Sequence, residues 1–280
     1  MSGPNIGTFL DSAGVSWGWF QGGFGDCMSK TPPENGPVLA LKQQGVTVAQ
    51  DPSDQTSDYS PHHEPFQYYA ATANPNHLPP TSVSMVGDQD QANHQYDISW
   101  FTKALAAGNL PAVSFLKAPR YEDGHASYSD PLDEQYYLIS MINAIEHSKA
   151  WKSTAIIIAY DDSDGWYDHA YGPIVNHSSA SIDDGLCGTT PAGAQPGRCG
   201  YGPRLPLLVI SPYAKSNVVD SKRTDQTSIL KFIEANWLHG KHISKESFDN
   251  WAGPLNSAFN FKGKHRNSPL FLNPLTGRKM

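Results

Sequence analysis

Four aspartates and a histidine occur within nine residues of the chain, directly after an apolar run. The run covers residues 154–160 and is followed by Asp161, Asp162, Asp164, Asp168 and His169. Carboxylate oxygens and imidazole nitrogens are ligands for divalent metals, so the cluster predicts a site for one such ion. Side chains alternate along a strand and are redirected by a turn, so not all five groups can reach one ion. The alternative is a solvated turn closed by Gly165.

Histidines recur in three further polar motifs. These are PHHEP with His62 and His63, RYEDGH with His125, and NHQYD with His94. A residue before proline avoids helical backbone, so the prolines around the first pair favour an extended loop. Imidazoles held in this way can bind anions when protonated, or transfer protons near neutral pH. The alternatives are that the pair of His62 and His63 is exposed and has no role, and that His125 is structural. A helix cap explains Asp97 and leaves the role of His94 open.

Apolar segments predict the strands that would position these groups, at residues 15–20, 112–116, 154–160 and 205–211. Helices are predicted to start with caps at Asp97, Asp130 and Asp225, and the first of them to stop at Gly108. The run 154–160 has no polar alternation, which is typical of a strand buried on both faces of a parallel sheet. Strands alternating with helices predict an α/β fold with a mostly parallel sheet. Ligands bind beyond the carboxyl ends of such strands, where the acidic cluster and His125 fall.

Composition excludes several classes of function. The 280 residues carry a formal net charge of −7, which argues against a nucleic-acid-binding surface. No apolar run is long enough to cross a membrane, and the first residues lack the basic and apolar regions of a signal peptide. There is no P-loop, strand-linked GxGxxG or GxSxG motif. Without a repeat or a clear linker, the simplest prediction is one domain over residues 1–280, with residues 252–280 as a tail on its surface.

Two cysteines flank a stretch rich in glycine and proline. A disulfide between Cys187 and Cys199 would stabilise this loop by roughly 3 kcal/mol and would indicate an oxidising compartment. Two free thiols are the alternative, because pairing cannot be deduced from sequence alone.

Five segments together resemble the bacterial phosphoesterase family that contains acid phosphatase A-type enzymes and non-haemolytic phospholipases C. The segments are YDDSDGWYDH, PHHEPFQYYA, NHQYD, NLPAVSFLKAPRYEDGH and GPRLPLLVISPYAK. The resemblance implies an α/β/α sandwich similar to alkaline phosphatase. By motif, it implies that Asp161 and Asp162 are metal ligands, that His62 and His63 lie near the phosphoryl group, and that His125 is a further active-site histidine.

The resemblance also implies a function. It indicates a metal-dependent hydrolase of phosphate esters that uses one divalent ion of unknown identity and a phospho-enzyme intermediate, in the periplasm or outside the cell. The substrate would be a small phosphate ester or a phospholipid head group, and the histidine-pair motif favours the phosphatase branch. A phospholipase C-type phosphodiesterase and a non-catalytic remnant that binds anions or a partner are the alternatives. In the family, the nucleophile and the other metal ligands precede the matched region, so we expect an N-terminally incomplete domain and assign no nucleophile.

Overall fold

A computed structural model describes residues 1–27, 57–126, 128–163, 168–175, 200–263 and 268–280. The chain divides into two compact units, one of residues 1–154 with 266–280 and the other of residues 155–265. Each unit is described by itself below. A single domain over the whole chain stays a prediction. No helix among the described residues is long and apolar enough to span a bilayer.

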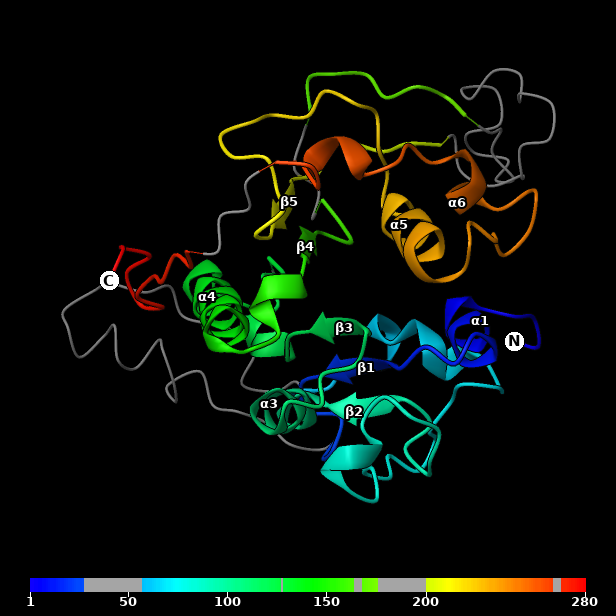
Figure 1. The fold of residues 1–280 in the computed structure, drawn as a ribbon. Coiled ribbons are helices and arrows are strands. Elements are labelled where there is room, and N and C mark those ends of the chain that lie inside the picture. Colours follow the sequence, from blue (N-terminus) through cyan, green and yellow to red (C-terminus); the bar gives the residue numbers. More distant parts are fainter. Residues whose placement is uncertain (28–56, 127, 164–167, 176–199, 264–267) are drawn as a thin grey trace. The chain divides into compact units, whose positions relative to one another are not determined.

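The first unit contains a three-stranded parallel sheet in the order β2–β1–β3 (Figure 1). Its strands are β1 (Trp17–Gln21), β2 (Gln95–Asp97) and β3 (Val113–Lys117). Trp19 at the centre of β1 pairs with Gln95 on one side and Phe115 on the other. The α/β fold with a parallel sheet is therefore confirmed. β1 and β3 match predicted strands, whereas β2 was not predicted because a strand of three residues is too short to show an apolar pattern.

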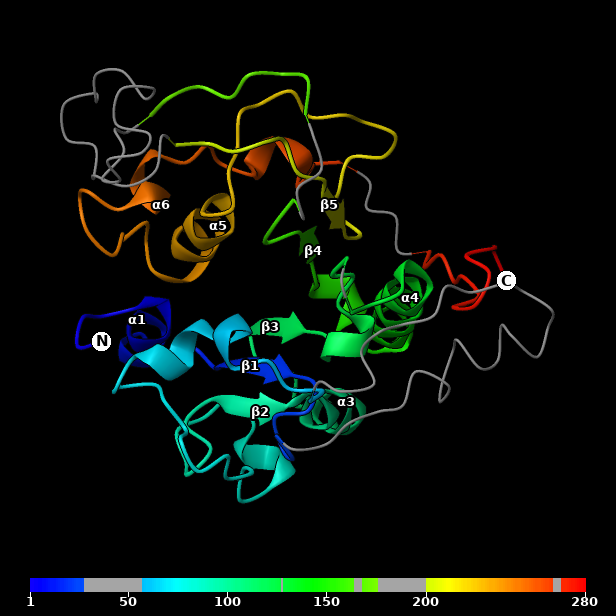
Figure 2. The ribbon, with the colours of Figure 1, turned by 180° about the vertical axis from the view of Figure 1, so that it is seen from behind.

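The described part of the first unit contains three α-helices, two of which pack on the sheet. They are α1 (Ile6–Ser12), α3 (Ile98–Ala107) and α4 (Pro131–His147). α1 packs on β1, and α3 packs on β1 and β2 (Figures 1 and 2). The predicted caps are confirmed for α3 and α4. Asp97 accepts a hydrogen bond from the Ser99 amide at 3.0 Å, and Asp130 accepts one from the Leu132 amide at 2.8 Å. Gly108 ends α3 with a φ of 73°.

The C-terminal residues pack along α4. Asn143 exchanges hydrogen bonds with the backbone of Leu272, at 2.7 Å to its carbonyl and 3.2 Å from its amide. The Leu270 amide donates to Glu146 at 2.8 Å, and the Phe271 ring stacks on His147. The end of the predicted tail is thus attached to the first unit.

The second unit contains a two-stranded sheet and two helices. These elements are β4 (Ile156–Ala159), β5 (Leu207–Ile210), α5 (Ser228–Trp237) and α6 (Phe248–Trp251). β4 was predicted to be a strand of the parallel sheet buried on both faces, and this was wrong. It pairs antiparallel with β5, Ile156 opposite Ile210, and its isoleucines are only partly buried. An apolar run identifies a strand, but it does not specify the direction of the strand beside it.

The cap of α5 was predicted at Asp225, and this was also wrong, because the helix begins two residues later. Thr227 is the N-cap, and Asp225 instead accepts a hydrogen bond from the Thr227 amide at 2.7 Å in the turn before the helix.

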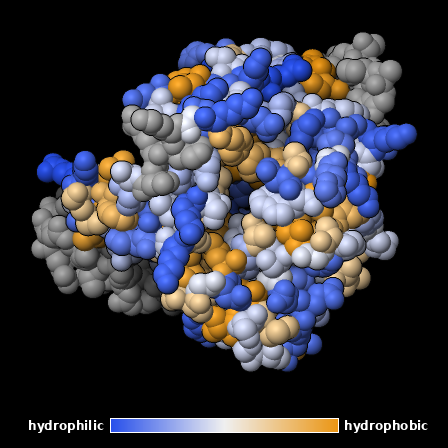
Figure 3. Space-filling view, in the orientation of Figure 1, coloured by the Kyte–Doolittle hydropathy of each residue, from blue (hydrophilic) through white to orange (hydrophobic). Residues whose placement is uncertain are grey.

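Hydrophilic and hydrophobic residues are interspersed over the face of the molecule seen in Figure 3. Exposed apolar side chains include Leu208 in β5 and Val219.

Two glycines directly follow β1 and allow other segments of the chain to approach the backbone closely there. A Cβ atom on Gly22 would lie 2.4 Å from the backbone nitrogen of Pro119, which follows β3. A Cβ atom on Gly23 would lie 2.6 Å from the Tyr59 nitrogen, and Gly23 has a φ of +76° that side chains disfavour. The chain after β3 and the loop containing Tyr59 therefore converge at the carboxyl end of β1.

We expect Gly22→Ala to destabilise the full chain by about 1–3 kcal/mol, because the added methyl group meets backbone that has no room to move. Urea unfolding followed by tryptophan fluorescence would measure the change. Gly3→Ala is the matched control, since a Cβ atom at Gly3 meets nothing within 4 Å. Equal stability of the two variants would contradict the close approach at the end of β1.

Candidate active site at the carboxyl ends of β1 and β3

The loop that contains the histidine pair is attached to both strand ends. Gln21, the last residue of β1, donates a hydrogen bond from Nε2 to the Ser60 carbonyl at 2.8 Å. The Arg120 amide, just after β3, donates to the Asp58 carbonyl at 2.9 Å. Residues Pro61–His63 form a single 3₁₀ turn instead of the predicted extended loop. Only Ser60, directly before the first proline, keeps the extended backbone that proline favours.

His63 and His125 lie around one carboxylate, that of Asp123. His63 Nδ1 is 3.6 Å from Asp123 Oδ2. The His125 amide donates to Asp123 Oδ1 at 3.1 Å, and the Tyr128 hydroxyl donates to Oδ2 at 3.2 Å. The His125 ring stacks on the Tyr128 ring with centroids 4.1 Å apart. Two of the predicted site histidines, 62 residues apart in sequence, thus share one neighbour.

His62 lies on the exposed side of this group. Its ring centroid is 4.2 Å from that of His63, and its Nδ1 is 3.1 Å from the hydroxyl of the buried Ser60. All three predicted histidines are therefore carried by segments held at the ends of β1 and β3. Their roles in catalysis stay predictions.

Asp123 was not predicted from the sequence to be a site residue. Its side chain is only 2% exposed, and this burial raises its pKa to about 6. The His125 amide, the positive charge of Lys117 and the Tyr128 hydroxyl limit the rise. Asp123 thus exchanges its proton close to neutral pH, next to His63. The available signal was its position two residues before His125 in the RYEDGH motif.

A second buried acid supports the histidine pair from inside the loop. Glu64, the residue after His63, is completely buried, and its Oε2 accepts a hydrogen bond from the Tyr59 hydroxyl at 2.8 Å. Burial raises the pKa of Glu64 to about 8, although the Tyr59 hydrogen bond opposes the rise. Burial and the nearby Asp133 and Asp58 likewise raise the pKa of Glu122 to about 8. The interior beneath the histidines therefore favours neutral carboxyl groups.

The predicted metal ligands follow β4 in the second unit. Asp161 and Asp162 are exposed, and Gln226 Nε2 fixes the strand end by donating to the Tyr160 carbonyl at 2.7 Å. Two adjacent carboxylates offer hard oxygen ligands, so their chemistry fits a divalent cation. Within the described part of this unit they do not form a group of three clustered metal-ligating side chains. Asp164 lies outside the described residues.

Asp168 is paired with Arg204. Arg204 donates to both carboxylate oxygens of Asp168, from Nη2 at 2.8 Å and from Nε at 3.0 Å. These bonds hold the pKa of Asp168 well below its usual range. The forked pairing closes the loop between residues 168 and 204, which gives Asp168 a structural role. His169 is exposed, and its place in a site stays a prediction.

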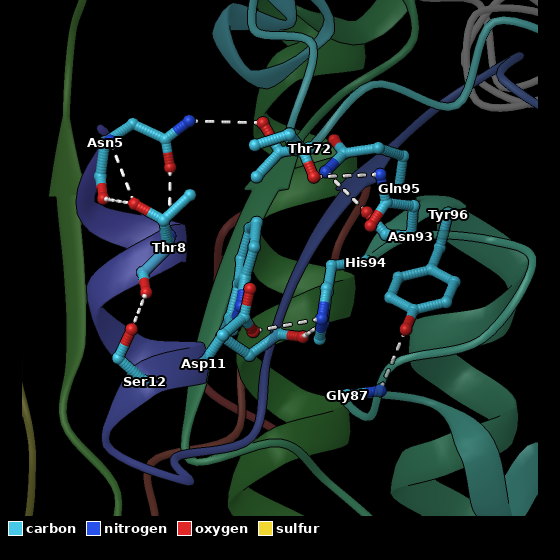
Figure 4. A network of polar contacts seen from close by, with 12 residues as sticks. Asn5, Thr8, Asp11, Ser12, Thr72, Gly87, Asn93, His94, Gln95 and Tyr96 are labelled. Atoms are coloured by element: carbon cyan, nitrogen blue, oxygen red, sulfur yellow. Dashed lines mark hydrogen bonds and ion pairs between the residues drawn. The ribbon is translucent and has the colours of Figure 1, made fainter. Parts of the chain in front are cut away.

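His94 lies in a buried network (Figure 4). Its Nε2 lies 3.1 Å from Asp11 Oδ1, and its Nδ1 lies 2.9 Å from the Trp17 carbonyl. The ring, with the residue 1% exposed, stacks on the Trp17 indole at 4.4 Å. Both ring nitrogens thus face α1 and β1, and a role of His94 in the site stays a prediction. Cys187 and Cys199 lie outside the described residues, so their pairing stays a prediction.

We expect stability to fall as pH rises, and Glu64→Gln to reduce this fall. The pKa of Glu64 is about 8 in the folded chain against an ordinary value of 4.5, so the folded state binds more protons between these limits. The contribution is complete below pH 4.5 and is lost as pH rises to about 8. Glutamine cannot titrate, so the difference in unfolding free energy between pH 5 and pH 8 should shrink. Urea denaturation at both pH values measures it, with exposed Glu246→Gln as the control. An unchanged difference in Glu64→Gln would contradict the assignment.

The sequence of the chain matches a known protein family. Residues 1–238 match the profile of the Phosphoesterase family. A non-hemolytic phospholipase C of Burkholderia pseudomallei strain K96243 is 29% identical over 92% of this chain and 33% of its own length. Phospholipase C A of Mycobacterium tuberculosis strain H37Rv is 27% identical over 96% of this chain and 45% of its own. A non-specific phospholipase C6 of Arabidopsis thaliana is 31% identical over 50% of this chain and 27% of its own.

The chain therefore spans less than half of the length of these relatives. The family match covers both the histidine segments of the first unit and the aspartate pair of the second. The chain belongs to the Phosphoesterase family.

Proposed function

We propose that the chain takes part in the hydrolysis of phosphoric esters, with the histidines around Asp123 acting on the phosphoryl group. The observation that supports this most directly is the convergence of His63 and His125 on one buried carboxylate at the strand ends. Phosphoryl transfer requires cationic groups near the phosphoryl oxygens and a proton for the leaving oxygen. Imidazoles beside a carboxylate can meet both requirements.

His63 is the proposed acid or base. Its Nδ1 faces Asp123, so Nε2 is the nitrogen through which it would meet the substrate. The carboxylate favours the tautomer with a proton on Nδ1 and stabilises the imidazolium. Protonated His63 would pass the Nε2 proton to the leaving alcohol oxygen as the P–O bond breaks. His125 and the exposed His62 would contact the other phosphoryl oxygens.

Asp161 and Asp162 are the proposed ligands of one divalent metal. Such an ion supplies positive charge that stabilises phosphoryl oxygens and activates an oxygen nucleophile. The two carboxylates lie directly after β4, held by the bond between Gln226 and Tyr160. No residue is proposed as the nucleophile.

Two substrate classes follow from this chemistry. The relatives described above are named phospholipases C, which favours a phosphodiester of a phospholipid head group over the phosphatase branch. Turnover of p-nitrophenyl phosphorylcholine and of p-nitrophenyl phosphate by the full chain, with and without added divalent metal, separates the classes. Faster turnover of the diester supports the first class, and faster turnover of the monoester supports the second. If both rates stay at background, the chain is a non-catalytic member, and binding of inorganic phosphate would then show that it still binds anions.

A periplasmic or extracellular location stays a prediction that cell fractionation would check.

Asp123→Asn is expected to lower kcat/KM by about 10²- to 10⁴-fold, because it removes the group that orients and charges His63. The pH dependence of the rate should also change, which a purely structural effect would not produce. Asp88→Asn, an exposed aspartate of the same unit, is the matched control. A rate and a pH profile equal to those of the wild type would remove Asp123 from the mechanism.

Asp162→Asn is expected to weaken divalent-metal binding and to lower any metal-dependent rate, because one of two carboxylate ligands is lost. Equilibrium dialysis against Mg²⁺, Mn²⁺ and Ca²⁺ measures the affinity. Glu246→Gln, an exposed acid of the same unit, controls for charge alone. Undiminished affinity in Asp162→Asn would refute its assignment as a ligand.

A further inference from the structure

A second group of metal-ligating side chains lies in the second unit. It consists of Glu234 in α5, His242 in the loop after this helix, and Asp249 in α6. The ligand atoms of all three lie within 4.8 Å of one another. None of these residues has a part in the proposed hydrolysis. The helices α5 and α6 that carry the two acids lie side by side (Figures 1 and 2).

Local backbone contacts bring the three side chains together. The Glu234 carbonyl accepts hydrogen bonds from the Leu238 and Gly240 amides, both at 2.9 Å, so the chain turns back at the end of α5. His242 follows this turn. α6 is attached to α5 by Lys231, whose Nζ donates to the carbonyls of residues 250 and 252 at 3.0 and 2.8 Å.

One imidazole nitrogen faces both carboxyl groups. His242 Nδ1 is 2.6 Å from Glu234 Oε2 and 3.1 Å from Asp249 Oδ2. The Glu234 side chain is 0% exposed and that of Asp249 is 3% exposed. Glu234 Oε1 is also buried, and it receives no hydrogen bond from any described donor. The carboxyl group at the centre of the cluster thus has an oxygen that the protein leaves without a partner.

Two adjacent buried carboxyl groups are costly unless a cation or a proton compensates them. Burial and the neighbouring Asp249 raise the pKa of Glu234 to about 8. Burial opposes ionisation of Asp249 too, but hydrogen bonds from Ser247 and Glu234 lower its pKa. A bound cation would compensate both carboxyl groups, because one ligand atom of each lies within 4.8 Å of the others in the cluster.

We propose that Glu234, His242 and Asp249 bind one Zn²⁺ ion, with water as the fourth ligand. One imidazole with two carboxylates suits Zn²⁺ better than Mg²⁺, which prefers six oxygen ligands. Ligands of a tetrahedral zinc ion stand about 3.3 Å apart, so the separations of His242 Nδ1 from Glu234 Oε2 and Asp249 Oδ2 need to grow by less than about 1 Å. The His242 side chain is 25% exposed and leaves a route for the ion and the water.

The proposed site is separate from the aspartate pair after β4. Gln226, which contacts the Tyr160 carbonyl just after β4, lies before α5, whereas Glu234 is six residues, or about 9 Å, beyond the first residue of this helix. The zinc ion would link α5, the loop with His242 and α6. Its expected role is therefore to stabilise the second unit, and the proposal is independent of the proposed hydrolysis.

The test uses the full chain carrying Asp161→Asn and Asp162→Asn, so that the aspartate pair after β4 does not contribute to the binding of Zn²⁺. Isothermal titration with Zn²⁺ should show one ion per chain, and Zn²⁺ should raise the melting temperature. Adding His242→Asn should weaken binding by at least about 100-fold and abolish the rise, because one of three ligands is lost. His239→Asn is the matched control. His239 is an exposed histidine three residues earlier, and its positive φ suits asparagine.

Cobalt gives a second readout. Co²⁺ in the same background should produce the absorption bands of a tetrahedral site, and these should disappear in His242→Asn and in Asp249→Asn but persist in His239→Asn. Circular dichroism would identify a variant that does not fold. If either His242→Asn or Asp249→Asn does not fold, the result for the other one tests the proposal. Absence of Zn²⁺ binding, or equal binding by a folded His242→Asn variant, would overturn the proposal and identify the cluster as a hydrogen-bonded group.

Discussion

The candidate active site depends on how closely other segments approach the end of β1. Gly22 and Gly23 have no side chains, and Pro119 and Tyr59 occupy the space where Cβ atoms would lie. This contact brings the segment after β3 and the loop with the histidine pair to one place. Because these segments approach so closely, His63 reaches Asp123, which already accepts a hydrogen bond from the amide of the neighbouring His125.

Burial of acids is the second constraint on this site. Glu64 and Glu122 have pKa values near 8, and Asp123 has one near 6, chiefly because each is removed from water. Neutral carboxyl groups beneath the histidines reduce the negative charge that would repel a phosphate. Asp123 is the acid of the three that contacts His63, and its proton is the most readily lost. The arrangement thus concentrates negative charge beside the histidine that we propose transfers a proton.

Much of the first unit could be predicted from local signals. Asp97, Asp130 and Gly108 act at single helix ends through their own backbone, so sequence alone was sufficient for them. β2 could not be predicted, because its burial comes from pairing with β1 and not from its own residues. The direction of β4 depends on β5, almost fifty residues later, and an apolar run contains no information about it. The histidines of the site were found as motifs, whereas the role of Asp123 depended on a contact that spacing does not reveal.

The cluster of Glu234, His242 and Asp249 shows why sequence patterns miss some sites altogether. Its members are separated by eight and seven residues and lie on a helix, a loop and a second short helix, so no helical or strand period aligns them. What distinguishes them from Asp161 and Asp162 is burial. The exposed pair keeps its hydration and suits a hard cation that retains water. The buried acids have lost their hydration, and an imidazole next to them supplies the nitrogen ligand that zinc prefers. The two sets of acids in the second unit therefore suit different cations. The exposure of their side chains, and not their spacing in the sequence, determines which cation each set suits.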